Sequence, residues 1–214
     1  MLRHCAAPAL LSLSMLVGFS STAQAELSGS ISVEQRYFLQ DAIYSSQPRA
    51  QSSIGLSPEW FFDWNEGDDT LVIKPFYRFD QEDPERTRYD IREFIWTHLG
   101  ADYEFRAGVG KVFWGQTESL HLVDIINQTD LVDATDFETK LGQPMVSFSY
   151  YFDAGTFSAF VLPYFRERTF AGVQGRLRPV VPISNDQAFY ESDDEQSHVD
   201  YALRWKQSLD NWEI

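Results

Sequence analysis

The charged and polar side chains of this chain are spaced in a way that would create an electrostatic field across a narrow passage. One set falls in residues 115–143 and consists of Glu118, His121, Asp124, Asn127, Asp130 and Asp133. A second set lies on strand-like segments elsewhere and consists of Lys74, Arg78, Glu104, Arg106, Arg204 and Lys206. Opposed charges in a passage of low dielectric select solutes by charge and dipole. The two sets predict a constriction loop that faces a pore-lining wall.

Two other interpretations of residues 115–143 stay open. In the first, the segment is an external loop whose acids are simply solvated. In the second, its carboxylates bind a hard cation such as Ca²⁺, or bridge lipopolysaccharide through cations, because carboxylate oxygens suit such ions. The spacing of the acids does not match an EF-hand, and we expect no resident metal and no cofactor.

A second long segment, residues 169–198, is rich in Gly, Pro and acids. Arginines lie in and just before its first part, at Arg166, Arg168, Arg176 and Arg178, and an acidic run occupies residues 191–195. A basic cluster of this kind would attract an anionic solute or a lipid phosphate. The alternative is an external loop whose charges are only solvated.

Motifs for catalysis are missing from the sequence. It contains no Gly-x-Ser-x-Gly, no paired-histidine zinc motif and no phosphate-binding loop. The histidines at His98, His121 and His198 are far apart in the chain. A lipid-acting barrel enzyme that uses Ser119 and His121 is a further alternative. We therefore expect that the protein is not an enzyme.

The elements that must position these residues are β-strands with one apolar face. In residues 52–64, every even position after the first is apolar or Pro, whereas the odd positions are mostly polar. Similar patterns predict strands at residues 27–39, 52–64, 70–80, 90–99, 102–114, 144–152, 156–168 and 199–206, with a ninth beginning at Trp212. The faces of residues 90–99 are ambiguous, because Phe94 and Trp96 share a side with Arg92 and His98.

The connections between these strands alternate between long and short. Outer-membrane barrels have short periplasmic turns and longer external loops, and they cross the bilayer with strands of about 9–11 residues. A soluble sandwich would place the same apolar faces in a protein core, but it has no reason to sort its loops by length. The pattern predicts an all-β fold, an antiparallel transmembrane β-barrel. The aromatic content of 15% agrees with interfacial girdles.

The first 25 residues predict a secretory signal peptide, and residues 26–214 predict the barrel. Arg3 and His4 precede a short apolar stretch, and Ala23 and Ala25 supply the small residues for cleavage. The only cysteine, Cys5, lies in this leader, so the mature chain is expected to have no thiol. The net charge of −15 argues against nucleic-acid binding, which depends on Lys and Arg at phosphates.

The end of the chain predicts an incomplete barrel. A barrel closes by pairing its last strand with its first, which leaves no open edge in lipid. Here eight strands are followed by a turn and the start of a ninth. We expect an N-terminal fragment that forms a curled open sheet. The alternative is a complete eight-stranded barrel with a short tail.

Two stretches resemble a signature of poorly characterised proteobacterial outer-membrane proteins. Residues 106–115 form a strand that ends in Trp-Gly, and residues 126–130 read Ile-Asn-Gln-Thr-Asp, with Gln128 where the signature has Pro. The resemblance covers residues 103–133 and implies an outer-membrane barrel. It implies a location in the outer membrane, with membrane lipid, lipopolysaccharide and the barrel-assembly machinery as partners.

Together these patterns predict a porin-like channel that gives small solutes passive or weakly selective passage. A structural or assembly barrel that transports nothing is the first alternative, and the lipid-acting enzyme is the second.

Overall fold

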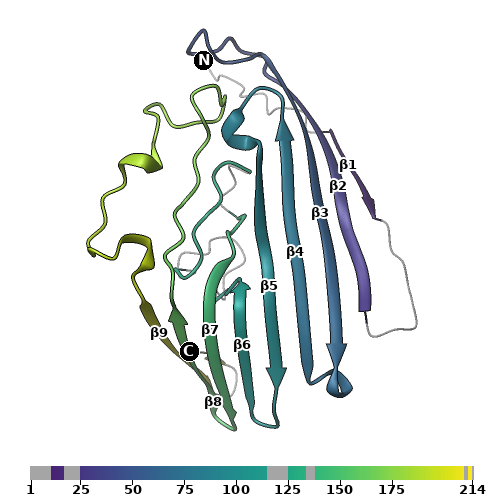
Figure 1. The fold of residues 1–214 in the computed structure, drawn as a ribbon, viewed down its shortest axis with the longest axis vertical. Coiled ribbons are helices and arrows are strands. Elements are labelled where there is room, and N and C mark those ends of the chain that lie inside the picture. The colour runs from purple at the N-terminus through teal and green to yellow at the C-terminus, as the bar shows by residue number, and fades with distance from the viewer. Residues whose placement is uncertain (1–10, 17–24, 115–124, 134–137, 210–211, 214) are drawn as a thin grey trace.

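The computed structural model describes residues 11–16, 25–114, 125–133, 138–209 and 212–213. Its strands form one antiparallel sheet whose strand order follows the sequence (Figure 1). The strands are β1 (Leu11–Leu16), β2 (Ala25–Tyr37), β3 (Ala50–Trp64), β4 (Asp69–Asp80), β5 (Arg88–Leu99), β6 (Tyr103–Gly110), β7 (Gln143–Phe152), β8 (Gly155–Leu162), β9 (Asp200–Leu209) and β10 (Trp212–Glu213). The 3₁₀ turns are η1 (Asn65–Gly67), η2 (Pro84–Arg86), η3 (Asn185–Gln187) and η4 (Glu195–Ser197). Within these ranges, no helix has the length and apolar character that a membrane crossing requires.

The eight predicted strands correspond to β2–β9, and the predicted start of a ninth corresponds to β10. The alternation of connections is also confirmed. Residues 38–49, 81–87, 111–142 and 163–199 form the long links, and residues 65–68, 100–102 and 153–154 form the short turns. Figure 1 shows the short turns at the lower end of the sheet and the long links at the upper end. The long links therefore share one end of the sheet.

Two predicted strand ends were wrong. The strand expected to reach residue 168 ends at Leu162, directly before Pro163. Proline has no N–H group to donate to a neighbouring strand, so the ladder stops there. The strand expected to reach residue 114 ends at Gly110. A side chain from the long link replaces the missing partner strand at that point, as described below.

One face of the sheet, called the outer face here, is apolar from strand to strand. A single row of register partners crosses all eight strands from β2 to β9 and contains only apolar or Tyr side chains. This row is Ala25, Phe62, Leu71, Trp96, Ala107, Val146, Val161 and Tyr201. The same face exposes Ile54 at 49%, whereas its neighbour Ser53 on the inner face is 3% exposed. The distribution is the reverse of the usual one, in which apolar side chains are buried.

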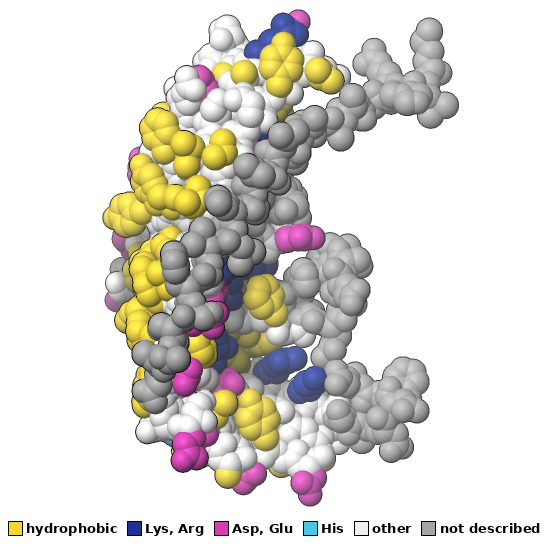
Figure 2. Space-filling view, turned by 90° about the vertical axis from the view of Figure 1, so that its right-hand side faces the viewer, with side chains coloured by type: hydrophobic (Ala, Val, Ile, Leu, Met, Phe, Trp, Pro, Cys, Tyr) yellow, Lys and Arg dark blue, Asp and Glu magenta, His cyan; other side chains and the backbone are white. Residues whose placement is uncertain are grey.

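The sheet is curved, with the outer face on its convex side (Figure 2). Figure 2 shows hydrophobic side chains along the convex side, while Lys and Arg side chains appear in the hollow of the concave side. The register agrees with the period-two alternation from which the strands were predicted. Trp60, Phe62, Tyr103, Phe105, Phe148 and Val161 lie on the outer face, and Arg78, Glu104, Arg106 and Arg204 lie on the inner face.

A β-bulge in β5 resolves the ambiguous faces of residues 90–99. Lys74 pairs with Glu93 and Pro75 pairs with Ile91, so Arg92 is an extra residue without a partner in β4. The extra residue shifts the alternation by one. Ile91 before the bulge and Phe94 after it therefore share the outer face, and Arg92 is buried on the inner face.

The described strands form a curled, open sheet, as expected. The order of the sheet places β1 and β10 at its edges, and β2 pairs with β1 and β3 rather than with β9. A closed eight-stranded barrel would need the pairing of β2 with β9. Strand β1 falls in the segment expected to be a signal peptide, and its cleavage stays a prediction.

Candidate functional site

The long link between β6 and β7 folds back over the inner face of the sheet. Asn127, which is 3% exposed, fixes the link through three backbone contacts. Its Oδ1 accepts a hydrogen bond from the Val112 N–H at 2.8 Å, and its Nδ2 donates to the Gly110 carbonyl at 2.9 Å and to the Leu141 carbonyl at 2.8 Å. The amide side chain thus takes the place of a neighbouring strand where β6 ends.

An apolar cluster lies beneath the returning link. It consists of Ile95, Val112, Ile126, Met145, Phe160 and Leu162, all of which are buried. Ile126 belongs to the link, Val112 to its first residues, and the others to β5, β7 and β8 or their ends. Burial of apolar side chains stabilises such contacts by roughly 25 cal/mol per Å². The link is therefore packed against the inner face of the sheet and is not held only at its ends.

Asp130 is the most enclosed polar group of the link, with no exposed surface. Its Oδ2 accepts from Arg92 at 2.8 Å and also contacts Arg88, and its Oδ1 accepts from the Thr169 hydroxyl at 2.9 Å. The backbone N–H groups of Val132 and Asp133 also point at Oδ1, at 3.2 and 3.1 Å. Burial raises the pKa of Asp130, but Arg88 and Arg92, together with the hydrogen bonds from Thr169 and the Asp133 N–H, hold the pKa below its ordinary value.

Asp133 makes a second attachment to the wall. Its Oδ1 lies 3.0 Å from Arg78 Nε, and its Oδ2 accepts from Arg92 at 3.2 Å. Arg78 also donates to Glu34 of β2 at 2.9 Å. The link is thereby joined through Arg78 of β4 to Glu34 of β2, on the same inner face.

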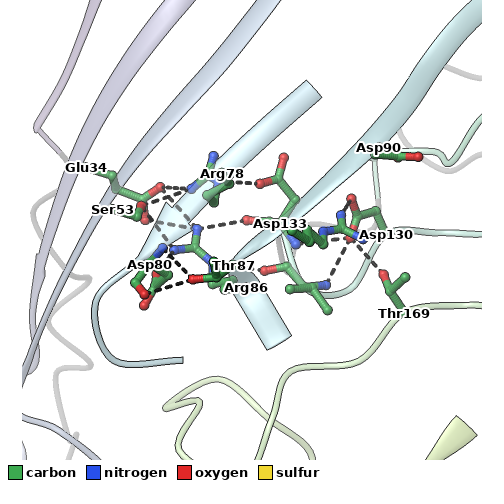
Figure 3. A network of polar contacts seen from close by, with 12 residues as sticks. Glu34, Ser53, Arg78, Asp80, Arg86, Thr87, Asp90, Asp130, Asp133 and Thr169 are labelled. Atoms are coloured by element: carbon green, nitrogen blue, oxygen red, sulfur yellow. Dashed lines mark hydrogen bonds and ion pairs between the residues drawn. The ribbon is translucent and has the colours of Figure 1, made fainter. Parts of the chain in front are cut away.

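Arg86 connects the loop after β4 to both the strands and the link (Figure 3). It is 2% exposed, and it donates to Asp80 Oδ2 at 2.7 Å and to the Val132 carbonyl at 3.0 Å. Figure 3 shows its guanidinium between Glu34 and Asp80 on one side and the backbone of the link on the other. A buried charge is tolerated only when it is paired and hydrogen-bonded, and this one has both kinds of partner.

The last long link, residues 163–199, joins the same network. Thr169 contacts Asp130 as described, and Arg166 contacts Asp90 of β5 and donates to the Gly142 carbonyl at 2.8 Å. Three long links therefore meet on the inner face around a core of paired arginines and carboxylates.

The structure brings together only some of the residues singled out in the sequence. Arg78, Asp130 and Asp133 belong to the network, whereas Asn127 holds the same link through backbone groups. Glu104, Arg106, Arg204 and Lys206 lie on the inner face along β6 and β9. Arg204 stacks over the Trp114 ring at 5.9 Å, whereas Lys74 pairs with Glu59 at 2.6 Å. Glu118, His121 and Asp124 lie outside the described residues.

Sequence reasoning missed Arg86, Arg88 and Arg92. Arg88 and Arg92 pair with Asp130, and Arg86 donates to the Val132 carbonyl of the same link. Arg86 and Arg88 lie in or at the end of the link between β4 and β5, whose charges had no role assigned from the sequence. Arg92 was missed because regular alternation placed it on one side with Phe94. Pro75 was the available signal, since a proline within a strand pattern often marks a bulge or an irregular pairing.

The described ranges contain no group of three or more His, Cys, Asp or Glu side chains arranged to hold a metal ion. No family model, no curated protein and no solved structure matches this chain.

Proposed function

We propose that this chain forms a wall of an outer-membrane β-barrel that passes small solutes. The observation that carries the proposal is the continuous apolar outer face of β2–β9, which is opposed by a charged inner face. Monomeric soluble proteins rarely expose apolar patches larger than a few hundred Å². In a bilayer the same face would be solvated by lipid, and the strands would satisfy each other's backbone groups.

The docked link between β6 and β7 supports a narrowed passage within that barrel. Its Asp130 and Asp133 lie against Arg78, Arg88 and Arg92, so acids and bases face each other on the inner side of the sheet. A field of this kind screens solutes by charge and dipole. Because Asp130 is wholly buried and paired, its first role is to hold the link, and the link then sets the width of the passage.

Single-channel recording in planar bilayers tests the proposal. Purified full-length protein should give discrete conductance steps, and Asp130→Asn should change their size or make them fluctuate as the link loosens. Asp193→Asn, in the exposed acidic run, is the matched control and should leave the steps unchanged. Folded, inserted protein without any conductance would contradict the proposal.

A barrel with a plugged lumen and no transport is the second candidate. The apolar cluster of Ile95, Ile126 and Phe160 favours it, because packed links fill space on the inner side of the sheet. The same recordings separate the two, since a plugged barrel inserts without conducting, and removal of residues 116–141 would then open a conductance that the intact chain lacks.

A further inference from the structure

Two adjoining hollows lie among the long links at the upper end of the sheet. The first has a volume of about 520 Å³ and lies between residues 84–88, Val132 and parts of residues 169–186. The second has a volume of about 480 Å³ and lies between Gln128 and residues 165–190. They share Phe170, Ile183, Ser184 and Asn185 as a common wall. Each volume falls within the range of about 300–1,000 Å³ that is usual for small-molecule sites.

The side chains around the second hollow combine aromatic rings with amide groups. The aromatic rings are those of Phe165, Phe170, Phe189 and Tyr190, and the amides are those of Gln128, Asn185 and Gln187. Phe189 is 96% exposed, which is an unfavourable position for a large apolar ring in water. A ring in this position is available to stack against a ligand.

Hydrogen bonds hold this wall in place. Glu167 accepts from Asn185 Nδ2 at 2.8 Å and from Gln196 Nε2 at 2.9 Å. Gln196 Nε2 also lies 3.3 Å from the Tyr190 hydroxyl, and the Tyr190 ring meets Phe165 edge-on at 6.4 Å. Rings and amides that are fixed before binding lose little conformational entropy when a ligand arrives.

The Asp130 network fixes the floor of both hollows. Gln128 and Val132 line them and stand two residues on either side of Asp130, and Thr169 is bonded to Asp130 itself. The two arginines of the lining already have partners. Arg88 contacts Asp130, and Arg168 donates to Gln128 at 3.2 Å. Glu85, Glu167 and Asp186 leave the lining without excess positive charge, which disfavours an anionic ligand.

We infer that these hollows form a binding site for a neutral, polyhydroxylated small molecule of the saccharide class. The exposed aromatic rings would stack on the C–H faces of the sugar. Asn185 Nδ2 already donates to Glu167 and to the Arg168 carbonyl, so Asn185 would accept from a sugar hydroxyl through Oδ1, while the Gln128 amide exchanges hydrogen bonds with others. The site lies at the end of the sheet where the long links gather. It goes beyond the proposed channel, because it assigns a ligand class that the passage itself does not require.

Saturation-transfer NMR on the purified full-length protein in detergent tests this assignment, with maltose and maltotriose as probes. Both sugars should bind, and gluconate, which carries a negative charge on a similar skeleton, should bind more weakly. Asn185→Ala should weaken sugar binding about tenfold, the loss expected for one unmade hydrogen bond of average strength. Phe189→Ala should also weaken sugar binding, and because Phe189 is exposed, this substitution removes no packing from the interior.

Val181→Ala is the matched control, because Val181 is exposed on the same link but lines neither hollow. Equal sugar affinity in the native protein and all three variants would overturn the assignment, and so would preferential binding of gluconate or of phosphorylated lipopolysaccharide core oligosaccharide. Sugar binding by a protein that does not conduct would refute the proposed channel function and support the saccharide site. Failure of one proposal can therefore be told apart from failure of the other.

Discussion

At the scale of single residues, buried charges decide how the inner face of the sheet is organised. Asp130 has no exposed surface, yet two arginines, one hydroxyl and two backbone N–H groups surround it. Asp83, in the loop after β4, is equally enclosed but has, in the described part of the chain, no arginine partner and fewer hydrogen bonds. Its Oδ1 accepts from the Glu85 N–H, whereas its Oδ2 has no hydrogen-bond partner among the described residues. The two carboxylates should therefore respond oppositely to substitution and to pH.

Asp130→Asn should destabilise the protein by about 3 kcal/mol, because it leaves the buried Arg92 and the partly buried Arg88 without their shared counter-charge. Urea unfolding in lipid vesicles measures this change. Asp193→Asn, which is exposed in the last long link, is the control and should shift the free energy of unfolding by less than about 0.5 kcal/mol. Similar values for the two variants would mean that the ion pairs around Asp130 contribute nothing.

Asp83→Asn should leave stability unchanged or raise it at neutral pH. Burial raises the pKa of Asp83, with the nearby Asp80 carboxylate adding to the effect, so its ionised form costs free energy in the folded state at neutral pH. That cost disappears as the pH falls and Asp83 takes up a proton, so the gain of the variant should shrink in acid. A clear loss of stability at neutral pH would show that the Asp83 charge is favourable.

The stabilisation from Asp130 should follow the opposite course. Its pKa is lowered in the folded state, so its contribution is complete above the ordinary value of 3.8 and is lost as the pH falls further. Unfolding measured between pH 3 and pH 7 should therefore show the difference between native protein and Asp130→Asn narrowing only at the acid end of this range.

At the scale of elements, a loop side chain completes a strand. β6 ends at Gly110, and the Asn127 amide then bonds the Val112 N–H and the carbonyls of Gly110 and Leu141. The link between β6 and β7 is thus attached by its own backbone partners as well as by the ion pairs of Asp130. The bulge in β5 acts on the same link, because it turns Arg92 to the inner face, where Arg92 donates to Asp130.

Asn127→Ala should release the link locally and cost about 2 kcal/mol, since three hydrogen bonds of modest net value are lost. Hydrogen exchange at the Val112 amide is the direct measurement, with amides in the middle of β3 as an internal reference. Faster exchange at Val112 and unchanged exchange in β3 is the expected pattern. Unchanged exchange at Val112 would mean that the Asn127 side chain does not protect that amide.

At the scale of the whole molecule, the apolar convex face and the charged concave face set the environment that the sheet requires. The row from Ala25 to Tyr201 keeps one character across β2–β9, which soluble proteins avoid on an open surface. The proposed bilayer location, the narrowed passage and the sugar site all depend on this division of faces.

Spin labels placed at Phe105 and Arg106 test the division directly. Cys5 is the only native cysteine, so after its replacement single cysteines direct the label to each position. In vesicles, a label at residue 105 should contact lipid, and a label at residue 106 should be accessible to water or packed protein. Phe105→Arg should also cost about 2–4 kcal/mol near the middle of the bilayer. Water access at residue 105 would refute the proposed orientation.

The sequence by itself determined which segments form β2–β9, the faces of all of them except β5, and the order of long and short connections. Alternation with a period of two is a local property, since it depends only on neighbouring side chains pointing to opposite sides. It therefore placed Trp60 and Phe105 on the outer face and Arg78 and Arg204 on the inner face. It also predicted that the acids of the link between β6 and β7 face basic residues.

Only the tertiary structure decided which basic residues these are. Arg86, Arg88 and Arg92 reach the link because a loop folds inward and a bulge shifts one strand by a single residue. The ends of β6 and β8 likewise depend on a distant amide in one case and on the loss of a donor at Pro163 in the other. The ion pairs of Arg88 and Arg92 join residues about 40 positions apart. Such pairs produce no periodic pattern in the sequence, because they depend on the register between strands and on how the links fold back over the sheet.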